Sequence, residues 1–157
     1  MTICWDVFSI GLTYTEEEML VAETSSRPAA DITILIVDDS ASVRKLIELS
    51  LRREGYSLVT ASSGLRALAA LAETEPDLVL LDLMLEAIDG IQLCAAIRRH
   101  PRLCDTPIVI LTGRESDADR EAGLRAGVNA YLTKPFRSEE LAAIVREQLA
   151  GARAGAV

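Results

Sequence analysis

Residues 32–40 read ITILIVDDS, and residues 78–84 read LVLLDLM. Both stretches join an unbroken apolar run to acidic side chains: Asp38 and Asp39 in the first, Asp82 in the second. Unbroken runs of Val, Ile and Leu are typical of parallel strands, because both faces of a parallel sheet are covered. The two stretches therefore predict two buried strands of an α/β sheet, each ending in carboxylates.

Two later apolar runs also lead to a polar side chain. Residues 108–111 are followed by Thr112, and residues 131–132 lead to Lys134. In open α/β sheets the ligand binds outside the carboxyl ends of the strands. We therefore expect the carboxylates, the Thr112 hydroxyl and the Lys134 ammonium to converge on one edge of the sheet. Such a set of groups suits phosphate and a hard divalent cation.

Segments with helical spacing separate these strands. The expected strands are 32–37, 58–61, 78–81, 108–111 and 131–132, and the expected helices are 40–54, 64–73, 89–100, 116–126 and 138–149. Ser40 and Ser138 are predicted to cap the first and last helices. Crossovers between parallel strands are nearly always right-handed. Five strand–helix units in series therefore predict an α/β, doubly wound, five-stranded parallel sheet with helices on both faces.

The chain is expected to divide into three parts. Residues 1–30 contain half of the aromatic residues and end in the linker-like segment that begins TSSRP, so they are expected to be a flexible extension. Residues 31–150 are the expected folded domain, and residues 151–157 a disordered tail. The sequence leaves open whether residues 1–18 are a docking peptide, a segment packed on the core or the product of an upstream start codon.

Length and charge limit the kinds of function. A chain of 157 residues is long enough for one domain with a full core. Its formal net charge of -8 argues against broad nucleic-acid binding and against attachment to an anionic membrane. No apolar stretch is long enough to span a bilayer, and no secretory signal is recognisable. We therefore expect a cytoplasmic protein, with Cys4, Cys94 and Cys104 as reduced thiols.

Taken in order, these motifs resemble the receiver domains of two-component response regulators. The resemblance covers about residues 32–149, and it rests on the following motifs at the family's spacings: Asp38–Asp39, Asp82, Asp89–Gly90, Thr112 and Lys134–Pro135. It implies the flavodoxin-like strand order 2-1-3-4-5. The chain departs from the family at Glu86 and Ala87, where receivers commonly carry Pro and Gly. The loop beside Asp82 is therefore expected to be less rigid.

The resemblance implies a phosphoryl-accepting role for Asp82. The donor would be a sensor histidine kinase or a histidine phosphotransfer protein, and Mg²⁺ would be the cofactor. The implied protein ligands of the metal ion are Asp38 (through water), Asp39, Asp82 and the backbone carbonyl of Met84. Hard oxygen ligands of this kind are the ones that Mg²⁺ prefers.

The resemblance also implies a switch. Lys134, which precedes a cis proline bond, would neutralise the phosphoryl group, and Thr112 would move towards it. The Tyr131 ring would then turn inward and change the face formed by the helix over 116–126, the strand that holds Tyr131 and the last helix. We expect a downstream protein target, or a second copy of the chain, to bind this face. No output domain fits after Leu149, so a stand-alone regulator of the chemotaxis type, without direct nucleic-acid contact, is expected.

Other functions would use some of the same residues. A diffusible effector and a phosphorelay shuttle that passes its phosphate to another histidine are equally compatible with the residues. A haloacid-dehalogenase-like phosphatase or mutase would need a second Asp two residues after Asp82, where this chain has Met84. A degenerate receiver that only binds proteins would not need the complete set of acid, hydroxyl and ammonium groups. We therefore expect a phosphoacceptor that catalyses its own phosphorylation and dephosphorylation, not an enzyme with a separate substrate.

Overall fold

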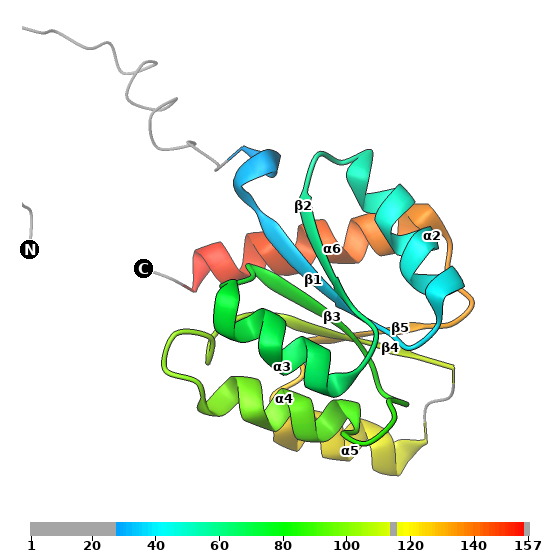
Figure 1. Cartoon of the computed structure of the whole chain (residues 1–157), viewed down its shortest axis with the longest axis vertical. Helices are drawn as coiled ribbons and strands as arrows, with labels where there is room; N and C mark the ends of the chain where they lie inside the picture. The colour runs from blue at the N-terminus through cyan, green and yellow to red at the C-terminus, as the bar shows by residue number, and fades with distance from the viewer. Residues whose placement is uncertain (1–27, 114–115, 156–157) are drawn as a thin grey trace, which may run out of the picture.

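The strands form one parallel β-sheet between two layers of helices (Figure 1). The computed structural model describes residues 28–113 and 116–155, so most of the extension expected over residues 1–30 lies outside the described residues. The strands are β1 (Thr33–Val37), β2 (Ser57–Ala61), β3 (Leu78–Asp82), β4 (Ile108–Thr112) and β5 (Ala130–Thr133). Every neighbouring pair is parallel, and the order is β2-β1-β3-β4-β5. The predicted order 2-1-3-4-5 is confirmed.

Helices cover both faces of this sheet, as expected. They are α2 (Ala41–Arg52), α3 (Gly64–Glu73), α4 (Gly90–Arg99), α5 (Asp117–Ala126) and α6 (Ser138–Ala154), and the short 3-10 helix η2 (Ala29–Asp31) precedes β1. Helices α2 and α6 pack together on one face, while α3, α4 and α5 cover the other (Figure 1). None of the described helices is long and apolar enough to cross a membrane.

The central strands are buried from both sides. Every residue of β3 and β4 is buried. On β1, Leu35 and Val37 join the core cluster beneath α3, α4 and α5, whereas Ile34 and Ile36 join the cluster beneath α2 and α6. Because successive strand side chains point to opposite faces, a strand covered on both sides needs an unbroken apolar run. This burial fixes the strand register and brings the strand ends to one edge of the sheet.

The chain leaves this edge through well-capped helix starts. The Ser40 hydroxyl accepts a hydrogen bond from the backbone N–H of Val43, as predicted for the first helix. Asp89 and Gln92 form a reciprocal capping box at the start of α4. The Ser40 cap comes directly after Asp39, and the Asp89 cap ends the loop that follows Asp82.

The prediction that Ser138 caps the last helix is wrong. Arg137 occupies the N-cap position of α6, and its backbone N–H donates to the Glu140 carboxylate. The Ser138 hydroxyl instead forms a 2.8 Å hydrogen bond with the hydroxyl of Ser50 on α2. This contact between two packed helices depends on tertiary structure, which local sequence does not reveal.

The last helix is also longer than expected. Helix α6 continues to Ala154, so residues 151–154 are helical where a disordered tail was expected to begin. Alanine is the best helix former, and a basic side chain in the last turn, here Arg153, interacts favourably with the helix dipole. These local preferences favour extension of the helix beyond its last core contact at Leu149.

Candidate functional site

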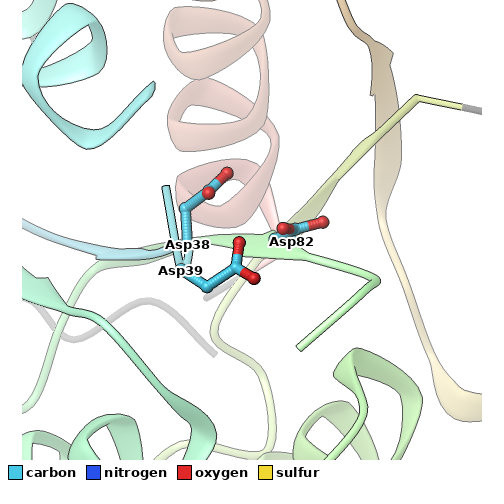
Figure 2. Close-up of side chains that lie close together, drawn as sticks. All are labelled: Asp38, Asp39 and Asp82. Atoms are coloured by element: carbon cyan, nitrogen blue, oxygen red, sulfur yellow. The ribbon is translucent and has the colours of Figure 1, made fainter. Parts of the chain in front are cut away.

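Three carboxylates meet at the carboxyl edge of the sheet (Figure 2). Asp38 and Asp39 follow β1, and Asp82 is the last residue of β3. One oxygen from each of the three carboxylates lies within 4.8 Å of the others. Asp38 and Asp82 are buried, with exposed fractions of 0% and 5%, whereas Asp39 is exposed. The strand register therefore brings these acids together, as the sequence predicts.

Lys134 supplies a positive charge to this cluster. Its ammonium nitrogen lies 2.7 Å from Oδ2 of Asp38 and 3.5 Å from Oδ2 of Asp82. The Lys134 backbone N–H donates to the carbonyl of Thr112, which anchors the start of the β5–α6 loop on β4. The peptide bond that follows Lys134 is cis, as the resemblance implied. The ammonium thus bridges the ends of β1 and β3.

Asp38 is held by main-chain and side-chain donors. Its Oδ1 accepts a 2.8 Å hydrogen bond from the Ser40 backbone N–H, and its backbone carbonyl accepts one of 2.6 Å from Arg44 Nη1. Arg44 was not among the predicted site residues. The available signal was its place one turn after the Ser40 cap, from where a long side chain reaches back over its own loop. Arg44 fixes the backbone that presents both Asp38 and Asp39.

Asp82 lies in an environment that opposes its ionisation. Burial is the largest influence and raises the pKa of the Asp82 carboxyl above its ordinary value of 3.8. A 3.1 Å hydrogen bond from the Met84 backbone N–H and the Lys134 ammonium lower this pKa, while Asp38 and Asp39 raise it, and the net direction is upward. The raised pKa of Asp82 therefore reflects mainly the burial of its carboxyl, with a further contribution from the neighbouring acids.

This donor set fits a divalent cation. Three carboxylates converge, and the single ammonium described in contact with them leaves negative charge uncompensated. Carboxylate oxygens are hard ligands, and Mg²⁺ is typically bound by one or two carboxylates together with waters and phosphate oxygens. Met84, two residues after Asp82, is 76% exposed.

The two predicted switch residues lie in different environments. Thr112 is the last residue of β4 and is 2% exposed, next to the β3 strand that ends in Asp82. Tyr131 lies on β5, and its hydroxyl donates a 3.3 Å hydrogen bond to the backbone carbonyl of Arg120 on α5. The structure therefore places Thr112 at the site edge and the Tyr131 hydroxyl against α5.

The loop after β3 has an unusual backbone. Ala87 has φ 66°, in the left-handed region, and the Ile88 N–H donates to the Glu86 carbonyl across it at 2.8 Å. Gly90 follows, and a Cβ there would lie only 2.6 Å from the Asp82 carbonyl oxygen. The close approach explains the need for glycine at the start of α4. Ala87 adopts the backbone conformation that glycine favours.

Comparison with known proteins identifies the family. The model for the response regulator receiver domain matches residues 34–146. Response regulator MprA of Mycobacterium sp. (strain KMS) is 43% identical over 118 residues, which cover 75% of this chain and 50% of that protein. A crystal structure of a putative response regulator from Chloroflexus aurantiacus is 41% identical with a TM-score of 0.72, and the match covers 76% of this chain and 98% of that one.

A magnesium-containing relative has the same fold. The receiver domain of the sensor histidine kinase PA1611 from Pseudomonas aeruginosa was solved with a magnesium ion coordinated in its active site cleft. It is 33% identical with a TM-score of 0.70, and the match covers 76% of this chain and 98% of that one. The two chains therefore share the receiver fold.

The chain belongs to the response regulator receiver family. Members of this family are signalling phosphoacceptors rather than enzymes that turn over a separate substrate. The chain spans about half the length of the curated relatives it matches. Some of these relatives are named as transcriptional or DNA-binding regulators.

Proposed function

We propose that Asp82 accepts a phosphoryl group from a sensor histidine kinase or a histidine phosphotransfer protein in a Mg²⁺-dependent reaction. The observation that carries this proposal is the meeting of three carboxylates and one ammonium at the carboxyl edge of the sheet. A helix cap or a surface ion pair would not need two buried acids and a lysine shared between them.

The residues have separate tasks in this reaction. A carboxylate oxygen of Asp82 attacks phosphorus, the bond between phosphorus and the donor's histidine nitrogen breaks, and an aspartyl phosphate forms. The Lys134 ammonium and the Thr112 hydroxyl bind the phosphoryl oxygens. Asp38 through water, Asp39, Asp82 and the Met84 carbonyl would hold Mg²⁺. The ion would neutralise charge between the phosphoryl group and the carboxylates.

The partners follow from the same site. Thr112 and Tyr131 would transmit the phosphorylation state to the face formed by α5, β5 and α6, where a protein target or a second copy of the chain binds. The net charge of -8 supports a protein partner rather than direct contact with nucleic acid. In this proposal the regulator acts in the cytoplasm.

Chemical phosphorylation tests the proposal. The protein is incubated with acetyl phosphate, with and without Mg²⁺, and its intact mass is measured. We expect one phosphoryl group with Mg²⁺, and none with EDTA or in the Asp82→Asn variant. Asp77→Asn is the matched control, because Asp77 precedes β3 at the opposite end of the sheet and accepts a hydrogen bond from the Thr33 backbone. No adduct, or one that persists in Asp82→Asn, refutes the proposal.

A further inference from the structure

Helix α5 has a glycine where the Tyr131 ring packs against it. Gly123 is buried in the interior of α5, where glycine costs about 0.5–1 kcal/mol relative to alanine. A Cβ built on Gly123 would lie 1.6 Å from the Tyr131 hydroxyl oxygen and 2.9 Å from the Cζ atom of the ring. No side chain can occupy this point of α5 while the ring holds its position.

Arg120 also contacts the ring from α5, and we call Gly123 and Arg120 together the seat of the Tyr131 ring. The Tyr131 hydroxyl donates to the Arg120 carbonyl at 3.3 Å, and the Arg120 guanidinium carbon lies 5.8 Å from the ring centroid. The ring itself packs against the core cluster beneath α5, which includes Val128. The hydroxyl and the ring face thus each have a neighbour on α5, and the ring packs against the core beside this helix.

We propose that Gly123 is the positioning residue for Tyr131, because the absence of a side chain at position 123 permits the ring to lie against α5. This inference deepens the proposed function, in which Tyr131 belongs to the target-binding face. The bare α5 backbone at Gly123 then determines where the Tyr131 ring lies. A side chain at position 123 displaces the ring towards solvent and changes the shape of the face between α5 and α6.

A double-mutant cycle of unfolding free energies tests this assignment, because the two explanations predict opposite signs for the effect of Gly123→Ala. Helix propensity alone predicts that Gly123→Ala stabilises the protein, shifting the unfolding equilibrium constant about two- to fivefold towards the folded state. If the Tyr131 ring occupies this space, Gly123→Ala in the natural chain should instead shift the unfolding equilibrium constant about fivefold or more towards the unfolded state, because the added methyl group clashes with the ring. In a Tyr131→Ala background the clash is absent, so Gly123→Ala should become stabilising.

Gly151→Ala is the matched control for this cycle. Gly151 also lies inside a helix, α6, but a Cβ there would meet no atom within 4 Å. Gly151→Ala should therefore be equally stabilising with and without the Tyr131 ring. Stabilisation by Gly123→Ala in the natural chain, or an effect independent of Tyr131, overturns the proposal.

Nitration reports the ring position directly. Tetranitromethane modifies exposed tyrosines, and peptide mass spectrometry gives the nitration rate of Tyr131 relative to Tyr56 in the same molecule. We expect Gly123→Ala to raise this ratio severalfold and Gly151→Ala to leave it unchanged. An unchanged ratio in Gly123→Ala refutes the seat. Acetyl phosphate labelling tests Asp82 independently, so failure of the proposed function and failure of the seat are distinguishable.

Discussion

Asp82→Asn should stabilise the protein in the absence of Mg²⁺, although it removes the proposed phosphoryl acceptor. The substitution keeps the shape of the side chain and an oxygen that can accept the 3.1 Å hydrogen bond from the Met84 N–H. It removes one negative charge from a cluster of three carboxylates. The cost of that charge in the folded state is visible in the raised pKa of Asp82.

The distances give the size of the effect. Carboxylate oxygens within 4.8 Å of each other repel by at least about 3 kcal/mol per pair of charges at an effective dielectric of about 20, and an ammonium 3.5 Å away attracts by about 5 kcal/mol. Asp82 has two such repulsions and one such attraction, and Asp39 is partly screened because it is exposed. The expected net gain is about 1–2 kcal/mol. Burial of the Asp82 charge adds to it in the same direction.

Urea unfolding as a function of pH measures this gain. A carboxyl whose folded pKa is raised stabilises the fold below its unfolded value, near 3.8, and loses this contribution as the pH rises through the folded value. Asp82→Asn should therefore be more stable than the natural protein at neutral pH, and the difference should shrink in acid. Mg²⁺ should stabilise the natural protein more than the variant. A variant less stable at neutral pH without Mg²⁺ would refute the charge argument.

Three other substitutions have defined expected outcomes. Lys134→Gln leaves a fully buried carboxylate without its 2.7 Å ammonium and should cost about 2–4 kcal/mol in urea unfolding without Mg²⁺, whereas exposed Lys45→Gln should change stability by less than about 0.5 kcal/mol. Arg98→Ala removes five hydrogen bonds to the loops around β4 and β5 and should lower the free energy of unfolding by about 2–4 kcal/mol. The neighbouring control Arg99→Ala should lower it by less than about 0.5 kcal/mol, and equal losses would contradict this account. Ala87→Gly relieves a left-handed backbone at φ 66° and should raise the thermal midpoint, with about 0.5–1 kcal/mol of stabilisation. An unchanged or lower midpoint would contradict backbone strain at this position.

The fold could be predicted because its signals are local and repeated. A strand covered on both faces must be apolar at every position, and residues 34–37 and 78–81 satisfy this requirement. Right-handed crossovers then restrict how successive strands can be placed. The Ser138 hydroxyl, in contrast, bonds to Ser50, 88 residues away in the sequence. A cap and a contact between helices use the same residue type, so the sequence alone favoured the wrong one.

The charged residues of the site could be predicted from the sequence, but the residues that hold the site in position could not. Asp38, Asp39 and Asp82 follow apolar strands, and the parallel sheet places all such ends at one edge. Arg44 and Gly123 carry no comparable signal, because a helical arginine and a helical glycine have many uses. Their roles depend on a 2.6 Å contact to a backbone carbonyl and on the space beside a tyrosine ring, both of which need the folded structure.

Mapping the phosphorylated residue tests the central claim most directly. The protein is phosphorylated with acetyl phosphate and Mg²⁺ and then reduced with borohydride, which converts an acyl phosphate to an alcohol and leaves free carboxylates unchanged. Peptide mass spectrometry locates the converted residue. The account predicts conversion of Asp82 alone, lost when EDTA replaces Mg²⁺. Conversion of Asp38 or Asp39 instead, or of no residue in a protein that carries phosphate, would contradict it.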